Sequence, residues 1–218
     1  MKVLITGSSG GIGSAAAQRF LSLGHDVCGI DIRPASVSHP AYTHFIADVK
    51  DAASLPEIGS VGIIFNNAGT QNSDDDIGNN LKGAINVTEK YMSSPDLVSV
   101  LFNVSASAVS GQEFPVYTAS KAGLLGYMKN TAIRLAPRKV TVNAISLGGV
   151  YTPLNDPVVN DPECWEAIMK VTPLKKWMTV DEVADWVVFL TTVNRSMSGQ
   201  NVLIDNGEYE LNPTFVWK

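Results

Sequence analysis

Short apolar runs rich in β-branched residues recur along the chain, and each is followed by a polar turn and a stretch in which apolar residues repeat at helical spacing. This alternation is typical of βαβ units, in which parallel strands form one sheet and helices cover both of its faces. The pattern therefore predicts a doubly wound α/β fold with a seven-stranded parallel sheet. The predicted strands span residues 2–6, 26–30, 44–47, 61–66, 98–104, 140–145 and 201–205.

Four longer stretches carry apolar residues at helical spacing and are predicted to be helices. Thr179 and Glu182 have the spacing of a capping box, in which each side chain accepts a hydrogen bond from the other residue's backbone N–H. The last helix is therefore expected to begin directly after Thr179. The run 153–162 is rich in Pro and Asn, which predicts a mobile loop. The predicted helices span residues 13–23, 80–92, 117–136 and 180–190.

Length and charge narrow the class of protein. A chain of 218 residues fits one α/β domain, so residues 1–218 are predicted to form a single domain. The formal net charge of -5 leaves no basic excess to neutralise the phosphates of a nucleic acid. Met1 leads almost directly into the first apolar strand, and no run is long enough to span a membrane. We therefore expect a cytoplasmic protein that binds neither nucleic acid nor membrane.

The positions of cysteine and histidine argue against a metal site. Cys28 and Cys164 lack C-x-x-C spacing, which predicts two reduced packing residues. His25, His39 and His44 lie in or near predicted turns, with no Cys, Asp or Glu at the spacing of metal ligands. No metal is expected.

A glycine-rich turn follows the first predicted strand and leads directly into the first predicted helix. Within it, Gly7 allows a tight turn, Gly11 lets the backbone approach a pyrophosphate, and Gly13 permits close packing of helix on strand. The helix N-terminus then presents N–H groups and the positive end of its dipole to the phosphates. This order of strand, glycines and helix predicts a dinucleotide site.

Asp31 ends the second predicted strand, about 20 residues beyond the glycine turn, where a carboxylate accepts hydrogen bonds from the adenosine ribose hydroxyls. The same carboxylate repels a 2′-phosphate, so we predict NAD in preference to NADP as the cofactor. Arg33 follows two residues later and is expected to weaken this preference. A simpler alternative is that Asp31 only ends the strand and caps a turn.

Tyr117 and Lys121 lie four residues apart at the start of a predicted helix, so they share one helical face. A phenol has a pKa near 10 and is a weak base at neutral pH. An ammonium group about 4 Å away in a partly dry site favours the phenolate by roughly 4 kcal/mol, which lowers the pKa by about 3. The pair is therefore predicted to take a proton from an alcohol or to give one to a ketone.

These residues, with four further motifs, resemble the short-chain dehydrogenase/reductase family over nearly the whole chain. The family's nucleotide turn T-G-x-x-x-G-I-G and its catalytic Y-x-x-x-K both occur. The resemblance implies a Rossmann fold and a homo-oligomer, either a dimer or a tetramer. The further motifs are Asp48-Val49 at the adenine, Asn66-Asn67-Ala68-Gly69 at a strand end, Asn80-Leu81-Lys82-Gly83 on a helix, and Val142-Asn143-Ala144-Ile145 before the nicotinamide loop.

The resemblance assigns a role to each matching position. It implies that Tyr117 is the general acid/base, that Lys121 lowers its pKa and binds the nicotinamide ribose, and that Asn80 carries a water of the proton relay. Val150 and Thr152 are expected to hold the carboxamide. The residues expected to contact the cofactor are Gly7, Ser9, Gly11, Ile12, Gly13, Asp31, Ile32, Asp48, Val49, Asn67, Ala68, Gly69, Tyr117, Lys121, Val150 and Thr152.

One catalytic position departs from the family pattern. The family carries a serine before the tyrosine, in an N-I-S-S run, and its hydroxyl polarises the substrate oxygen. Here the run that starts at Asn103 is N-V-S-A-S, and register from Asn103 places Ala106 at that position. Ser105 has the more familiar distance to Tyr117, whereas Ser107 lies past the strand end. Both serines remain candidates.

A second departure concerns one edge of the sheet. The links 48–66 and 69–80 are shorter than family members usually show, so helices at this edge are expected to be trimmed or missing. One of these helices commonly helps to build the oligomer interface, which leaves the mode of assembly open. The apolar run 215–217 is another candidate contact between subunits. The acidic run 74–76 is expected to be a solvated loop.

Two functions remain. The first is an NAD-dependent oxidoreductase that transfers hydride between nicotinamide and a secondary alcohol or ketone, with residues 152–178 as a lid over the substrate. The second is a non-catalytic NAD-binding sensor or scaffold, which the displaced serine favours and which the intact Tyr117, Lys121 and Asn80 oppose. The sequence does not identify the substrate, because pocket side chains rather than the fold set specificity.

Overall fold

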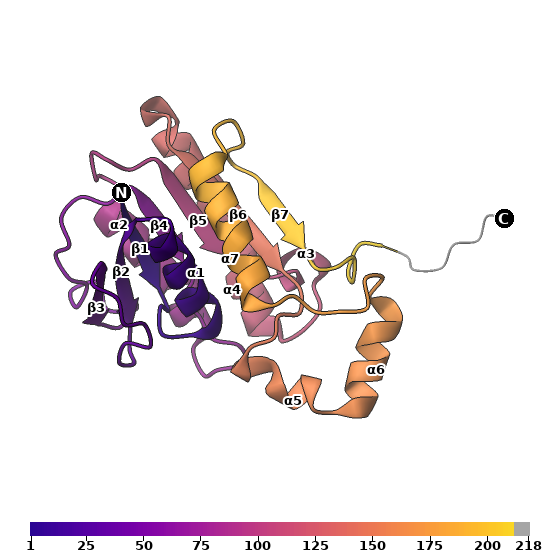
Figure 1. Ribbon diagram of the computed structural model, residues 1–218. Coiled ribbons are helices and arrows are strands. Elements are labelled where there is room, and N and C mark those ends of the chain that lie inside the picture. The colour runs from indigo at the N-terminus through magenta and orange to yellow at the C-terminus, as the bar shows by residue number, and fades with distance from the viewer. Residues whose placement is uncertain (212–218) are drawn as a thin grey trace.

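The computed structural model describes residues 1–211, and its centre is one parallel sheet (Figure 1). Seven strands lie in the order β3-β2-β1-β4-β5-β6-β7, and every neighbouring pair is parallel. The order reverses between β1 and β4, so the carboxyl ends of these strands flank a crevice. The strands are β1 (Lys2–Thr6), β2 (Asp26–Asp31), β3 (Tyr42–Ile46), β4 (Ile63–Asn66), β5 (Ser99–Asn103), β6 (Thr141–Leu147) and β7 (Asn201–Ile204).

Helices cover both faces of this sheet (Figure 1). They are α1 (Gly11–Ser22), α2 (Gly83–Tyr91), α3 (Ser107–Ser110), α4 (Pro115–Leu135), α5 (Asp156–Val159), α6 (Pro162–Val171) and α7 (Val180–Val188), with π-helical turns η1 (Ile77–Lys82) and η4 (Phe189–Val193) and 3-10 turns η2 (Ala136–Arg138) and η3 (Pro153–Asn155). α1 and α7 lie against each other on one face, joined at the surface by an ion pair of 2.7 Å between Arg19 and Asp185. α2 and α4 cover the opposite face.

The predicted seven-stranded parallel sheet is confirmed. Strands of such a sheet are buried on both faces, which explains why their sequences are continuously apolar. In β1, Leu4 packs into the core beneath α2 and α4, while Val3 and Ile5 pack into the core beneath α1 and α7. The predicted capping box at the start of α7 is also confirmed, because Thr179 and Glu182 cap each other's backbone N–H groups.

The predicted loop at 153–162 is mostly helical, so that prediction was wrong. η3 and α5 occupy much of it, and α6 begins at Pro162. Proline favours a helix start, because its φ is already near the helical value and the first turn leaves its N–H groups unpaired. Asp161 completes the start of α6, since its carboxylate accepts the backbone N–H groups of Glu163 and Cys164.

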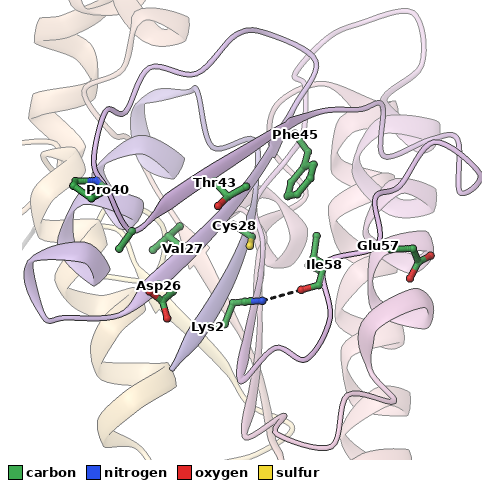
Figure 2. Close-up of a pocket in the computed structure, with 10 residues that line it drawn as sticks. Lys2, Asp26, Val27, Cys28, Pro40, Thr43, Phe45, Glu57 and Ile58 are labelled. Carbon is green, nitrogen blue, oxygen red and sulfur yellow. Dashed lines mark hydrogen bonds between the residues drawn. The ribbon is translucent and has the colours of Figure 1, made fainter.

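The sheet edge around β3 has the trimmed link that the sequence predicted. Residues 47–62, all of which the structure describes, contain turns but no helix. A cavity of about 340 Å³ lies beside this link, near the amino ends of β1 and β2, and Figure 2 shows the side chains that line it. There the Lys2 ammonium donates a hydrogen bond of 2.9 Å to the carbonyl oxygen of Ile58. This hollow is at the opposite end of the strands from the glycine turn.

The chain beyond residue 211 lies outside the described part of the structure, and this includes the predicted contact residues Phe215, Val216 and Trp217. Among residues 1–211, no helix is both long and apolar enough to cross a lipid bilayer.

Candidate active site

A cavity of about 1090 Å³ opens at the carboxyl ends of the strands, around the point where their order reverses. It is larger than the roughly 300–1,000 Å³ of a pocket for a drug-sized ligand. Of the predicted site residues, Asn80 and Ser107 do not line it. The predicted residues that do line it are Gly7, Ser9, Gly11, Ile12, Gly13, Asp31, Ile32, Asp48, Val49, Asn67, Ala68, Gly69, Ser105, Tyr117, Lys121, Val150 and Thr152.

The glycine turn is packed so closely that it accepts only glycine at two positions. Gly7 has a φ of +66°, and a Cβ there would lie 2.9 Å from the Cα of Ala68. A Cβ on Gly13 would lie 2.1 Å from the carbonyl oxygen of Gly7. No side chain of the described residues caps the N-terminus of α1. The N–H groups of its first turn are therefore available to an anion in the cavity.

Asp31 lies at the carboxyl end of β2 with its side chain 5% exposed. Its Oδ2 accepts the backbone N–H of Ser9 at 2.9 Å, and its Oδ1 accepts the backbone N–H of Arg33 at 2.9 Å and that residue's Nε–H at 3.3 Å. Burial opposes ionisation, but these hydrogen bonds outweigh it and hold the pKa of Asp31 below its ordinary value. The carboxylate both holds the turn and lines the cavity.

Tyr117 and Lys121 line the cavity from the first turns of α4. The Lys121 ammonium lies 5.8 Å from the centre of the Tyr117 ring and donates a hydrogen bond of 3.0 Å to the carbonyl oxygen of Asn103. Burial raises the pKa of Tyr117 to about 12 and lowers the pKa of Lys121 to about 8. In the protein without cofactor, desolvation of the phenolate thus sets the pKa of Tyr117 above its ordinary value, and the lowering of this pKa by Lys121 stays a prediction.

The two candidate serines lie at different depths. Ser105 lines the cavity just after β5. Its hydrogen bond with Tyr117 lowers the pKa of the phenol, but burial raises this pKa by more. Ser107 is fully buried at the start of α3 and donates a hydrogen bond of 3.0 Å to the hydroxyl oxygen of Ser105. The fold thus brings Ser105 to the tyrosine and places Ser107 behind it.

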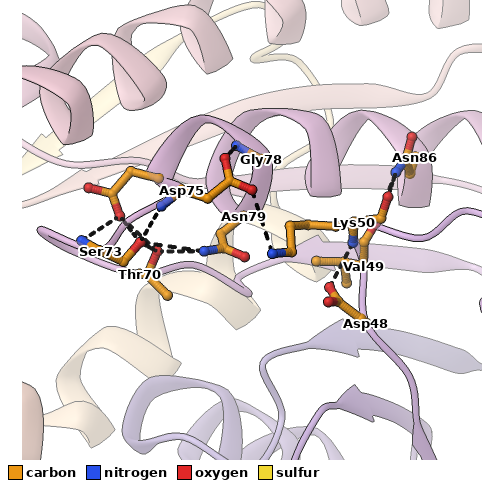
Figure 3. Close-up of polar contacts among 10 residues, drawn as sticks. Asp48, Val49, Lys50, Thr70, Ser73, Asp75, Gly78, Asn79 and Asn86 are labelled. Carbon is orange, nitrogen blue, oxygen red and sulfur yellow. Dashed lines mark hydrogen bonds and ion pairs between the residues drawn. The ribbon is translucent and has the colours of Figure 1, made fainter.

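Asn80 lies in η1 and is fully buried away from the cavity. Its Nδ2 donates hydrogen bonds of 2.9 Å to the carbonyl oxygen of Thr70 and to the hydroxyl of Ser120, and its Oδ1 accepts the Thr70 N–H at 2.7 Å. The neighbouring Asn79 lines the cavity instead and donates to the Thr70 hydroxyl at 3.1 Å (Figure 3). The side chain of Asn80 therefore anchors the Thr70 segment, and its place in a proton relay stays a prediction.

The acidic run 74–76 is not uniformly solvated, and the prediction was wrong for Asp76. This residue is 1% exposed, and its Oδ1 accepts hydrogen bonds of 2.7 Å from the hydroxyl of Ser73 and 2.8 Å from that of Thr70. Its Oδ2 is buried without a hydrogen-bond partner among the described residues. Burial opposes the ammonium form of Lys121 most strongly. Among the groups that favour this form, the charge of Asp76 has the largest effect. A carboxylate from the shortened link thus favours the ammonium form of Lys121.

The outer parts of the cavity are held by contacts at two further strand ends. Asp48, after β3, accepts the backbone N–H of Lys50 at 2.9 Å, and the Lys50 ammonium lies 3.5 Å from a carboxylate oxygen of Asp75 (Figure 3). Val150, after β6, pairs with Met178 in a short parallel bridge. These contacts fix the walls at the predicted adenine and carboxamide positions.

The residues that line the end of the cavity beyond Tyr117 were not predicted from the sequence. The residues there come from separate segments that carry no motif, so only the fold brings them together. Trp177, which also lines this end, falls within the predicted lid 152–178. The missed lining residues are Gln71, Glu113, Phe114, Glu208 and Tyr209.

Comparison with known proteins tests the resemblance of the motifs. A family model described as enoyl-(acyl carrier protein) reductase matches residues 7–208. The chain belongs to the short-chain dehydrogenase/reductase family. The match covers both the nucleotide turn and the Tyr117–Lys121 pair of this short-chain dehydrogenase/reductase.

Relatives within the short-chain dehydrogenase/reductase family span nearly the whole chain. A glucose 1-dehydrogenase of Gluconobacter oxydans is 29% identical, over 94% of this chain and 91% of its own length. A 3-oxoacyl-[acyl-carrier-protein] reductase of Staphylococcus aureus is 27% identical, over 94% of this chain and 97% of its own length. The crystal structure of a family member from Burkholderia thailandensis superposes with a TM-score of 0.88 at 29% identity, covering 97% of this chain and 93% of its own. All three are oxidoreductases by name, and the glucose dehydrogenase and the 3-oxoacyl reductase are named for different substrates.

Proposed function

We propose that the protein is an NAD(H)-dependent oxidoreductase that transfers hydride between nicotinamide and a secondary alcohol or ketone. The observation that carries this proposal is a single cavity that joins the glycine turn to Tyr117 and Lys121. A phenol held in a dinucleotide cavity can exchange a proton with the substrate oxygen while hydride moves at the adjacent carbon. Family membership supports oxidoreductase chemistry, and the names of the relatives include both a sugar dehydrogenase and an acyl-carrier reductase.

The lining residues fit a dinucleotide at three points. The close approach of Gly7 to Ala68 keeps side chains out of the turn, the uncapped start of α1 suits a pyrophosphate, and the ionised Asp31 suits ribose hydroxyls. Asp31 would hold the adenosine ribose, and Lys121 would hold the nicotinamide ribose. When bound, the nicotinamide supplies the hydride acceptor for oxidation or the hydride donor for reduction.

Each residue of the reactive group has a distinct task in this proposal. In reduction, the neutral phenol of Tyr117 donates its proton to the carbonyl oxygen, while Ser105 donates a hydrogen bond to the same oxygen. Lys121 stabilises the phenolate that remains, because a pKa of about 8 leaves the ammonium largely protonated at neutral pH. The carbonyl oxygen of Asn103 holds that ammonium in place. Oxidation runs through the same proton transfer in reverse.

The main alternative is a non-catalytic NAD-binding sensor or scaffold. NADH absorbance, followed with a panel of sugars, polyols, hydroxysteroids and hydroxyacyl thioesters, separates the two functions. Turnover of any panel member supports the oxidoreductase. NADH binding without turnover anywhere in the panel contradicts the proposal and supports the sensor.

Asp31→Asn is expected to raise the affinity for NADPH relative to NADH at least about tenfold. The substitution removes a carboxylate that repels a 2′-phosphate, and it frees the Arg33 guanidinium, now 3.3 Å from that carboxylate, to bind the phosphate instead. Calorimetric titration of the full chain with each cofactor measures the ratio. Asp26→Asn, at the exposed opposite end of β2, is the matched control. An unchanged ratio in Asp31→Asn would contradict the assignment of Asp31.

Asp76→Asn is expected to shift the alkaline fall of kcat/KM to lower pH. Asp76 and Glu113 both favour the ammonium of Lys121, against the larger opposing effect of burial. Loss of one negative charge lowers the pKa of Lys121, so this group loses its proton at lower pH. A tenfold weaker proton affinity of Lys121 would lower the protonated fraction of this group at pH 8 about fivefold.

The matched control for this pH profile is Asp75→Asn, since the Asp75 side chain is exposed and pairs with Lys50. The control is expected to keep the alkaline fall of the unmodified protein. If the pH profile of Asp76→Asn coincides with the profiles of the unmodified protein and of Asp75→Asn, Asp76 has only a structural role.

A further inference from the structure

Charge is distributed unevenly along the cavity. At the adenosine end, the basic Arg33 and Lys50 are balanced by Asp31 and Asp48, and Lys121 lies beside Tyr117. Beyond Tyr117, the charged residues of the described lining are Glu113 and Glu208. The part of the cavity open to a substrate is therefore acidic.

Glu113 lies four residues before Tyr117, in the segment that leads into α4. Its Oε2 accepts a hydrogen bond of 3.2 Å from the side-chain amide of Gln71, and its Oε1 accepts one of 3.4 Å from the hydroxyl of Tyr209. Its charge opposes ionisation of Tyr117 and favours the ammonium of Lys121. A carboxylate with spare acceptor sites thus lies close to the proposed acid/base group.

Glu208 is held on an aromatic wall. Its Oε2 accepts a hydrogen bond of 3.2 Å from the indole N–H of Trp177. Trp177 is itself fixed, because a Cβ on Gly149 would lie 1.9 Å from the indole ring, and the ring packs against Trp165 at 5.2 Å and Tyr151 at 6.3 Å between centroids. The position of the Glu208 carboxylate is therefore set by rigid neighbours rather than by solvent.

We propose that this end of the cavity selects a neutral, hydroxyl-rich substrate, such as a sugar or polyol, and rejects substrates that carry a carboxylate or phosphate. Glu113 and Glu208 accept hydrogen bonds from substrate hydroxyls, and their charge repels anions. This inference rests on the proposed hydride transfer, because the recognised hydroxyls surround the alcohol that reacts at Tyr117. It names the substrate class that the proposed function leaves open.

A neutral hydroxyl suits these carboxyl groups better than an ammonium group does. Both glutamates accept hydrogen bonds from neutral donors, and neither forms an ion pair within the described residues. Desolvation in the cavity is the main reason that the pKa of each carboxyl group lies above its ordinary value. A site built to hydrogen-bond hydroxyl groups also discriminates against analogues that lack them, since its acceptor groups are then left unpaired.

The test compares sugars of similar size and different charge. The full chain, saturated with NADH, is titrated calorimetrically with D-glucose, D-glucosamine and D-glucuronate, and with the acyclic pair D-sorbitol and D-gluconate. We expect at least one neutral compound to bind at least about tenfold more tightly than its anionic counterpart. In Glu113→Gln and Glu208→Gln, this ratio is expected to fall at least about fivefold, because each substitution keeps the shape and removes the charge. Glu166→Gln, whose exposed carboxylate pairs with Lys170, is the matched control.

Each outcome of this test decides the inference. Tighter binding of an anion, binding of no neutral compound, or an unchanged ratio in both glutamine variants would overturn it. Tightest binding of glucosamine would replace it with a cationic substrate. The proposed function has a separate readout, which is NADH formation when NAD replaces NADH. Charge selection without turnover of any compound would count against hydride transfer and leave the selection standing.

Discussion

Replacing Tyr117 with phenylalanine is expected to lower kcat at least about a hundredfold while changing the affinity for NADH by less than about threefold. Removal of a general acid/base typically costs 10²–10⁴ in rate. Cofactor binding should persist, because the glycine turn and Asp31 lie at the other end of the cavity and do not contact the phenol. Steady-state kinetics and a calorimetric titration with NADH measure the two quantities.

Tyr127→Phe is the matched control for this substitution. Tyr127 lies further along the same helix, and its hydroxyl donates a hydrogen bond of 2.7 Å to Glu89 rather than lining the cavity. The control is expected to keep full activity. Full activity in Tyr117→Phe would contradict the proposed acid/base role, and equal losses in both variants would point to damage in α4.

Gly13→Ala is expected to weaken NADH binding at least about tenfold and to lower the melting temperature. The new Cβ would lie 2.1 Å from the carbonyl oxygen of Gly7 and 2.9 Å from the side-chain amide of Asn67. The turn can relieve this contact only by moving away from α1, which displaces the groups that face the pyrophosphate. Overpacking of this kind costs roughly 1–3 kcal/mol, or a melting temperature lower by about 2–12 °C in a protein of this size.

Gly126→Ala is the control for the added methyl group. Gly126 lies in α4 away from the cavity, and a Cβ there would meet no atom within 4 Å. Alanine stabilises an exposed helix interior by up to about 1 kcal/mol relative to glycine, so this variant should melt slightly higher and bind NADH normally. Normal NADH binding by Gly13→Ala would show that the turn does not hold the pyrophosphate.

The sheet and the placement of the glycine turn and Asp31 at one cavity were predictable because their signals are local. Each strand is a short apolar run, Gly7 has a positive φ that favours glycine, and Gly13 lies against the carbonyl oxygen of Gly7 only six residues earlier. Asp31 follows from the same logic, since it ends a strand whose position the pattern fixes. The structure of such elements is determined by a few neighbouring residues of the sequence.

The substrate half was not predictable, because its properties arise from contacts between distant segments. The pKa of Tyr117 depends on burial, which four-residue spacing to Lys121 does not report. Asp76 sits in an acidic run that resembles a solvated loop, yet the short link holds it inside the protein. Glu113 and Glu208 line the same cavity only because the fold places their segments together.

The segment 151–177 begins and ends at the same place in the fold. Val150 and Met178 form a parallel bridge, the Tyr151 N–H donates to the carbonyl oxygen of Met178 at 2.9 Å, and the Met178 N–H donates to that of Gly149 at 3.1 Å. Because both ends are fastened at the same place, the length and composition of the segment can vary with little strain on the strands. The pocket that this segment lines can therefore change by exchange of the segment, while the sheet and the glycine turn are kept.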